Sequence, residues 1–275
     1  MSFDPRVTLM RNGVADARLE GVIAADRYAP ARPSQAVAPA TALRAAPDAG
    51  AEQVDQLLFG EGFDRLETAG DFVLGQSLRD GYVGWVEAAA LAEDVIVPTH
   101  WVSGLRAYAF AEPSIKAPAA GPVSFNALVT IGEETPALAR AERIGWIAKA
   151  HLKPIGFVLD DPADAALMHL GAPYLWGGRD SAGLDCSGLM QQALLACGLP
   201  CPRDSDQQEK LGEPAPGEAL ERSDLIFWPG HVAMMIDARR MVHANAFAMA
   251  VTVEPLATAR KRIGEPIAYR RLKIA

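Results

Sequence analysis

One cysteine in this sequence has neighbours that suit a nucleophile. Cys186 lies in the segment Leu184-Asp-Cys-Ser-Gly-Leu189, at the expected start of a helix. A helix N-terminus has backbone N–H groups without helical partners and a partial positive charge, and both favour the nucleophilic thiolate. We expect Gly188 to let a substrate approach the backbone closely. A buried core cysteine is the alternative, because free cysteines are usually buried, but the polar neighbours Asp185 and Ser187 favour the nucleophile.

A cysteine nucleophile needs an imidazole base within hydrogen-bond reach, and that imidazole needs an orienting partner. Of the five histidines, His231 opens a predicted strand and His243 lies on the next one. A hairpin centred on Asp237 places these two positions opposite each other on one face, with Cβ atoms about 5 Å apart. We therefore predict that His243 orients His231 and that His231 faces Cys186. Two separate histidines at strand ends remain the alternative.

The elements that position these residues are visible in the last part of the chain. Asp185 is a natural N-cap for the helix, and Gly198 with Pro200 marks its end. The apolar stripe of the helix comprises Leu189, Met190, Ala193, Leu194 and Cys197. Consecutive strands of one sheet are predicted at Asp224–Trp228, His231–Ile236 and Met241–Asn245. Cys197 and Cys201 are interpreted as core residues.

An ordered series of motifs over residues 156–275 resembles the signature of the NlpC/P60 peptidases. The motifs are Tyr174-Leu-Trp-Gly-Gly, Asp185-Cys-Ser-Gly, Pro202-Arg-Asp-Ser-Asp-Gln-Gln208, Ser223-Asp-Leu-Ile-Phe, His231-Val and His243-Ala. The resemblance implies an α+β, papain-like catalytic domain. It also implies that Cys186 attacks, that His231 is the base and that His243 orients it. Tyr174 matches the family tyrosine beside the cysteine, and its hydroxyl can stabilise an oxyanion together with the Cys186 N–H.

Two small β blocks precede this domain. Short predicted strands with turn signals fill residues 41–93 and 94–155, and both blocks resemble bacterial SH3-like (SH3b) barrels. Gly81-Tyr-Val-Gly-Trp-Val supports the first block and Ile144-Gly-Trp-Ile the second. Residues 1–40 are predicted to be an N-terminal extension that ends in an extended Pro/Ala linker. The expected fold is therefore an α+β catalytic domain preceded by two all-β barrels.

This arrangement resembles γ-D-glutamyl-L-diamino acid endopeptidases. The resemblance implies cleavage between γ-D-Glu and a diamino acid, either diaminopimelate or lysine, in murein peptides with a free N-terminal L-Ala. A site that buries an ammonium group needs carboxylates to pair with it. The candidate substrate-binding residues are Asp185, Ser187, Asp204, Ser205 and, reaching in from the first barrel, Glu61 and Tyr82. For Glu61 and Tyr82 the alternative is an ordinary turn glutamate and a barrel tyrosine.

The composition limits the kinds of partner and the cellular location that we expect for the protein. The net charge is −8 and no long basic run occurs, so nucleic acid and anionic membranes are not expected partners. We expect no secretory signal, no membrane span, and no cofactor or metal. Only three cysteines occur, which favours a cytoplasmic protein. A cytoplasmic enzyme of this kind is expected to recycle imported murein tripeptides and tetrapeptides.

Three other functions stay open at this point. The chain can be a wall-peptide-binding protein with an inactive catalytic domain, because SH3b domains often tether proteins to the wall. The same thiol and imidazole can serve a papain-like amidase or acyltransferase, since a fold does not fix its chemistry. A Cys/His/His metal site that activates water is a third alternative.

Overall fold

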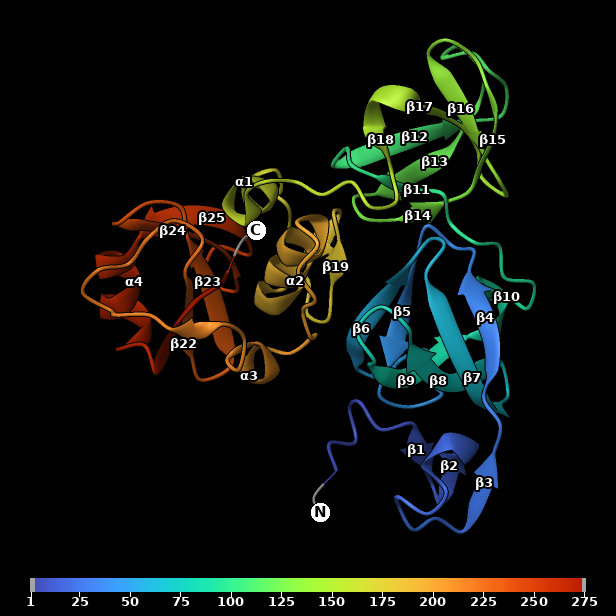
Figure 1. The fold of residues 1–275 in the computed structure, drawn as a ribbon, viewed down its shortest axis with the longest axis horizontal. Coiled ribbons are helices and arrows are strands. Elements are labelled where there is room, and N and C mark those ends of the chain that lie inside the picture. Colours follow the sequence, from blue (N-terminus) through green and yellow to red (C-terminus); the bar gives the residue numbers. More distant parts are fainter. Residues whose placement is uncertain (1–2, 274–275) are drawn as a thin grey trace. The chain divides into compact units, whose positions relative to one another are not determined.

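The computed structural model describes residues 3–273 of the chain (Figure 1). Two compact units make up the protein, the first ending at Ile155 and the second beginning at Gly156. The first unit is built almost entirely of short strands, whereas the second combines helices with a six-stranded sheet.

The first unit begins with a small sheet where the sequence predicted only an extension. Its strands are β1 (Met10–Arg11), β2 (Val14–Asp16) and β3 (Arg27–Ala29), and a 3₁₀-helix, Ala17–Leu19, follows β2. β1 pairs with β2 antiparallel, and β2 pairs with β3 parallel.

A seven-stranded sheet follows in the order β10-β4-β7-β8-β9-β5-β6. Its strands are β4 (Arg32–Ala36), β5 (Ala40–Arg44), β6 (Gln53–Leu58), β7 (Gly62–Ala69), β8 (Phe72–Ser77), β9 (Val83–Glu87) and β10 (Leu91–Ala92), with a 3₁₀-helix at Ala88–Ala90. Leu43, Leu57, Phe63 and Val86 are fully buried in its core. Burial of such side chains is the main favourable contribution to folding of a small barrel.

The predicted Pro/Ala linker is wrong where it overlaps β4. β4 pairs with β7 from Arg32 to Gln35, whereas β10 flanks it only at Gln35 and Ala36. Pro33 therefore lies where β4 has a strand on one side only, and such a position tolerates a residue without a backbone N–H. The side chain of Gln35 also donates to the carbonyl oxygens of Gly60 and Ile96, which fixes the strand in place.

Residues 100–154 form a second all-β body with two sheets, ordered β14-β11-β18 and β13-β12-β17-β16-β15. The strands are β11 (His100–Val102), β12 (Arg106–Phe110), β13 (Ala119–Ser124), β14 (Leu128–Val129), β15 (Ile131–Glu134), β16 (Leu138–Ala141), β17 (Gly145–Ala148) and β18 (Leu152–Pro154), with a 3₁₀-helix at Lys149–His151. Val102, Val123 and Ile147 are buried in its core, and Phe59, which follows β6, belongs to the same apolar cluster.

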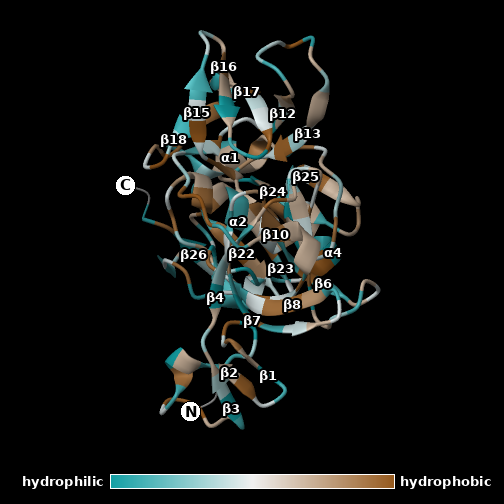
Figure 2. Cartoon of the chain, turned by 90° about the vertical axis from the view of Figure 1, so that its right-hand side faces the viewer, coloured by the Kyte–Doolittle hydropathy of each residue, from teal (hydrophilic) through white to brown (hydrophobic). Residues whose placement is uncertain are grey.

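The second unit contains a six-stranded sheet in the order β21-β26-β22-β23-β24-β25. Its elements are α1 (Pro162–Leu167), β19 (Arg179–Asp180), β20 (Gly183–Leu184), α2 (Cys186–Ala196), α3 (Ser205–Gln208), β21 (Glu213–Pro214), β22 (Leu225–Trp228), β23 (His231–Met235), β24 (Arg240–Asn245), β25 (Ala250–Pro255), α4 (Leu256–Ile263) and β26 (Ala268–Arg271). α2 packs against β23 and β24. Most side chains of β22, β23 and β24 are buried. Many of these residues are hydrophobic (Figure 2), so α2 packs on an apolar sheet.

Candidate active site

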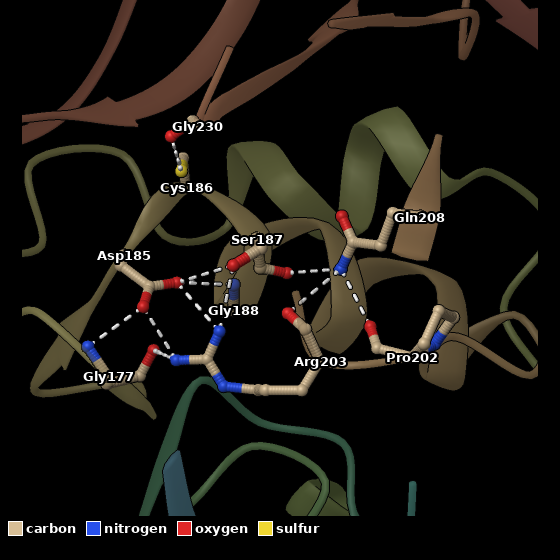
Figure 3. A network of polar contacts seen from close by, with 10 residues as sticks. Gly177, Asp185, Cys186, Ser187, Gly188, Pro202, Arg203, Gln208 and Gly230 are labelled. Carbon is tan, nitrogen blue, oxygen red and sulfur yellow. Dashed lines mark hydrogen bonds and ion pairs between the residues drawn. The ribbon is translucent and has the colours of Figure 1, made fainter. Parts of the chain in front are cut away.

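The first turn of α2 holds the candidate nucleophile, and Asp185 fixes that turn. The carboxylate of Asp185 accepts a hydrogen bond from the Gly188 backbone N–H at 2.7 Å and another from the Ser187 hydroxyl at 3.1 Å. Its second oxygen accepts from the Gly177 N–H at 2.9 Å (Figure 3). The predicted N-cap is therefore confirmed, and Cys186 is the first residue of the helix.

Arg203 is a buried partner of Asp185 that the sequence reasoning missed. The guanidinium donates to both carboxylate oxygens, at 2.6 Å and 3.0 Å, and to the Ser187 hydroxyl at 2.9 Å (Figure 3). The side chains of Arg203 and Asp185 are only 1% and 8% exposed. Such a two-pronged pair fixes geometry, since the planar guanidinium matches a carboxylate. The structure thus gives Asp185 a positioning role, and its contact with a substrate ammonium stays a prediction.

The short helix α3 is also tied to the head of α2. The Gln208 side-chain amide donates to the backbone carbonyls of Ser187 and Pro202, both at 2.9 Å. Asp204 precedes α3 as its N-cap residue and Ser205 is its first residue. Both are partly exposed and follow Arg203 directly in the chain. Their role in substrate binding, like that of Ser187, stays a prediction.

Gly188 was expected to let a substrate approach the backbone closely. In the structure it instead allows two backbone segments to pack together. A Cβ atom at this position would lie 2.2 Å from the carbonyl oxygen of Gly178. The first turn of α2 therefore approaches the Gly178 backbone so closely that only glycine fits.

The sulfur of Cys186 lies against the backbone on both sides of His231. The distance from its Sγ to the carbonyl oxygen of Gly230 is 4.0 Å (Figure 3), and the backbone N–H of Val232 hydrogen-bonds the sulfur. His231 opens β23 between these two residues. The start of the helix therefore meets the start of this strand, and the prediction that the His231 ring faces Cys186 stays a prediction.

Burial of Cys186 opposes the thiolate that its place at the helix N-terminus was expected to favour. Burial, followed by the charge of Asp185, raises the pKa of the Cys186 thiol to about 11. The Val232 N–H, Arg203 and the Ser187 N–H lower this pKa by less. Burial disfavours the charged form of a thiol, and it is the largest influence on this pKa. In the substrate-free site, burial therefore favours the neutral thiol over the thiolate.

His231 and His243 are in direct contact. The Nε2 atom of His231 lies 2.8 Å from the Nδ1 atom of His243, and the ring centroids are 5.1 Å apart. The predicted register is wrong by two residues, because Met234 pairs with Val242 and Met235 with Met241, which centres the turn on residue 238. The shift is even, so both histidines remain on one face of the sheet.

Two further residues contact His243. Its Nε2 atom lies 2.8 Å from a carboxylate oxygen of Glu254 and 3.1 Å from the amide nitrogen of Asn245. Burial lowers the pKa of His243, and burial with the charges of His243 and Arg262 lowers the pKa of His231 to about 4. Because a buried imidazolium is costly, both rings are neutral near pH 7.

Tyr174 is held beside the nucleophile by backbone contacts. Its N–H donates to the Met249 carbonyl at 2.9 Å, and it forms a bridge with Leu184, just before the helix. Burial and the charges of Cys186 and Asp185 raise the pKa of Tyr174 to about 12. The hydroxyl therefore keeps its proton and is a hydrogen-bond donor.

Glu61 and Tyr82 lie inside the first barrel. Glu61 is 1% exposed, accepts a hydrogen bond from the Leu58 N–H at 2.9 Å and forms an ion pair with Arg79. Tyr82 is 6% exposed and belongs to the barrel core. Their assignment to the substrate pocket stays a prediction.

The other two cysteines lie in the core of the second unit. Cys197 and Cys201 are buried, and none of the three cysteines forms a disulfide within residues 3–273. Within that range no cluster of His, Cys, Asp and Glu side chains has the arrangement of a metal site. The same part of the chain contains no helix long and apolar enough to cross a membrane.

Two segments of the chain match models of known protein families. Residues 171–262 match the NlpC/P60 family, and residues 43–91 match the bacterial dipeptidyl-peptidase SH3 domain. The first match contains the nucleophile and all its contacts described above.

Two curated proteins illustrate the similarity in sequence. The γ-D-glutamyl-L-lysine dipeptidyl-peptidase of Bacillus cereus is 36% identical over 107 residues, which cover 36% of this chain and 32% of that protein. The match thus spans about a third of the length of that relative. Dipeptidyl-peptidase 6 of Lysinibacillus sphaericus is 29% identical over 241 residues, which cover 78% of this chain and 88% of that protein.

Among solved structures, an NlpC/P60 family protein from Bacillus cereus ATCC 10987 has the same fold. The TM-score is 0.76 at 24% sequence identity, and the match covers 87% of this chain and 99% of that one. An NlpC/P60 endopeptidase from Photobacterium damselae matches with a TM-score of 0.64 at 12% identity, covering 86% of this chain and 72% of that one.

Proposed function

The chain carries a cysteine peptidase domain of the NlpC/P60 family behind a bacterial SH3 domain, and from this premise we propose its reaction. We propose that it hydrolyses the bond between γ-D-Glu and a diamino acid in murein peptides that begin with L-Ala. The observation that carries the proposal is the hydrogen bond between His231 and His243, together with the contact of the Cys186 sulfur with the backbone that flanks His231. The names of the Bacillus cereus and Lysinibacillus sphaericus relatives support the choice of substrate.

The attack begins from a neutral pair. The Nε2 atom of His231 is engaged with His243, so Nδ1 is the nitrogen left to accept the proton of Cys186. As the thiol proton moves to Nδ1, the sulfur attacks the γ-carbonyl carbon of D-Glu. Because the pKa of His231 lies well below that of the Cys186 thiol, His231 removes the thiol proton from very few molecules in the resting enzyme. Deprotonation is therefore coupled to formation of the carbon–sulfur bond.

The oxyanion of the tetrahedral intermediate needs hydrogen-bond donors. The backbone N–H of Cys186 donates to no other group among the described residues, and it lies at the N-terminus of α2. The protonated Tyr174 hydroxyl supplies a second donor. Two fixed donors in a water-poor site stabilise the developing charge.

The intermediate then collapses and the carbon–nitrogen bond breaks. The imidazolium of His231 gives its proton to the departing amine of the diamino acid, which leaves Cys186 acylated as a thioester. A water molecule then attacks the thioester carbonyl, and His231 takes the proton of that water. The thiolate leaves, recovers its proton from His231, and L-Ala-D-Glu is released.

The rest of the proposal concerns the peptide and its surroundings. We propose that a free N-terminal amine on L-Ala is required. The candidate binding residues are Asp185, Ser187, Asp204, Ser205, Glu61 and Tyr82. We further propose that residues 94–155 form a second SH3-like barrel. The protein would act in the cytoplasm on free tripeptides and tetrapeptides during wall-peptide recycling, without nucleic acid or membrane partners.

The decisive experiment is incubation with L-Ala-γ-D-Glu-diamino acid, followed by mass spectrometry of the products. The expected products are L-Ala-D-Glu and the free diamino acid, for either diaminopimelate or lysine. Acetylation of the N-terminal amine should abolish cleavage, and intact sacculi should be cleaved far more slowly. Cleavage of a different bond, or equal rates with the acetylated peptide, contradicts the proposal.

A further inference from the structure

We propose that Glu254 is a positioning residue of this active site, whose carboxylate fixes on which nitrogen atoms His243 and His231 carry their protons. The relay then runs from Cys186 through His231 and His243 to Glu254. The inference deepens the proposed function, because it concerns the base of the same site.

The position of Glu254 follows from the sheet. β25 pairs antiparallel with β24, with Thr252 opposite His243 and Glu254 opposite Met241. Glu254 is thus a diagonal neighbour of His243 on the same sheet face. One carboxylate oxygen lies 2.8 Å from the Nε2 atom of His243, and the side chain is only 15% exposed.

Arg262 keeps this carboxylate charged. Its guanidinium contacts both oxygens of Glu254, one of them at 2.9 Å. The side-chain hydrogen bond from Arg262 lowers the pKa of Glu254, against burial, which raises it. The guanidinium also lies 4.6 Å from the ring centroid of Phe247. Glu254 is therefore held as an anion that accepts hydrogen bonds.

An anionic acceptor dictates the tautomer of each ring in turn. Glu254 can only accept, so the Nε2 atom of His243 must carry a proton, and its Nδ1 atom is then an acceptor. His231 must donate to that acceptor through Nε2–H, because the two atoms are 2.8 Å apart. The Nδ1 atom of His231 is consequently free of a proton. That is the nitrogen the mechanism needs as a base.

Asn245 shows what Glu254 has to prevent. Its amide nitrogen lies 3.1 Å from the Nε2 atom of His243 and is oriented by contacts with Thr252 and Ala248. Without the carboxylate, this amide would donate to Nε2 of His243. His243 would then carry its proton on Nδ1 and donate it to His231, and His231 would place its own proton on Nδ1, the nitrogen that the proposed mechanism uses as the base. The base would be blocked.

The charge of Glu254 acts in the same direction as its hydrogen bond. When His231 takes the thiol proton, an imidazolium forms beside neutral His243, with Glu254 and Arg262 as the charged groups nearby. Glu254 raises the pKa of His231, whereas Arg262 lowers it. Removal of Glu254 should thus lower the pKa of His231, while opening of the site to water would raise it towards 6.5.

The first test needs no substrate and no variant. Nitrogen-15 NMR of the histidine rings in the unmodified protein should show Nε2–H on both His231 and His243 near neutral pH. A proton on Nδ1 of His243 would overturn the proposal. Because this measurement does not depend on turnover, its result is independent of whether the proposed peptide is cleaved.

The second test compares Glu254→Gln with Glu265→Gln. Glu265 is an exposed partner of Arg260 just after α4, so its variant controls for loss of a surface carboxylate nearby. We expect Glu254→Gln to lower kcat by about 10²-fold or more with little change in KM, as expected for a base in the wrong tautomer. Glu265→Gln should retain kcat.

The pH profile separates positioning from structural damage. Activity needs neutral His231 and is lost as the pH falls through the pKa of this ring. In Glu254→Gln the acid limb of kcat should therefore move to lower pH. Unchanged kcat, or an acid limb that moves to higher pH, would overturn the proposal.

Discussion

Two carboxylate–arginine pairs flank the nucleophile, and they differ in what they hold. On the helix side, Asp185 and Arg203 bind each other, the Ser187 hydroxyl and backbone N–H groups. On the sheet side, Glu254 and Arg262 end a chain of two histidines. The first pair is almost fully buried, whereas the second is partly exposed.

The difference shows how one chemical motif serves two tasks. The partners of Asp185 are a guanidinium, a hydroxyl and backbone N–H groups, which offer no choice of tautomer, so that pair positions the sulfur and tunes its pKa. The groups around Glu254 are imidazoles with two possible proton sites each, so that pair also selects a protonation pattern. Rupture of the helix-side pair should therefore cost mainly stability, and rupture of the sheet-side pair mainly catalysis.

The largest effect is expected when the sulfur of Cys186 is removed. Cys186→Ala should lower kcat by about 10³-fold or more, because no other group can form the acyl intermediate. Product formation by mass spectrometry measures this directly, and circular dichroism checks that the fold is retained. Turnover that persists in this variant would favour water as the nucleophile. Neither carboxylate–arginine pair would then act on a cysteine nucleophile.

Asp185→Asn tests the helix side. It leaves the buried charge of Arg203 without a counter-ion, which should lower the free energy of unfolding by about 3–5 kcal/mol. Glu254→Gln should lower it by about 1 kcal/mol or less, because the sheet-side pair is partly solvated. Urea unfolding measures both, with Arg240→Gln, in an exposed pair with Asp237, as the control. Equal losses of unfolding free energy in Asp185→Asn and Glu254→Gln would contradict the proposed difference between the two pairs.

Tyr174→Phe probes a group that belongs to neither pair. Removal of one oxyanion donor should lower kcat by about 10²-fold, with KM nearly unchanged. Steady-state kinetics with the tripeptide measure the two constants separately. A rise in KM at constant kcat would instead assign Tyr174 to substrate binding.

The smallest expected effect is the pH dependence of the rate at which Cys186 is alkylated. Because the pKa of the Cys186 thiol is raised to about 11, its alkylation by iodoacetamide should accelerate about tenfold per pH unit from neutral pH towards that value. Peptide mapping distinguishes Cys186 from the other two cysteines. A rate that is flat between about pH 6 and pH 8 would indicate a resting thiolate–imidazolium pair instead.

Local rules predicted the parts of the site that lie close together in the chain. The Asp185 cap and the start of α2 follow from a few adjacent residues. The side-by-side placement of His231 and His243 follows from the period of a strand, and it survived an error of two residues in the register. The family resemblance likewise placed the catalytic domain on residues that match the NlpC/P60 model.

The parts that could not be predicted depend on distant pairings. Arginine is mostly exposed in proteins, so nothing local marked Arg203 as buried. Glu254 contacts His243 only because β25 joins the sheet in one particular register. The pKa of Cys186 depends on how deeply the folded protein buries its side chain, and the local sequence does not reveal that burial. Each of these is a property of the assembled unit.

The neutral thiol has a consequence for the lifetime of the enzyme. Peroxides oxidise cysteine through its thiolate, and a sulfur that keeps its proton until a peptide arrives forms sulfenic acid slowly. The reactive state is limited to the moments of turnover. Idle molecules should therefore survive oxidative stress that inactivates enzymes with a permanently ionised cysteine.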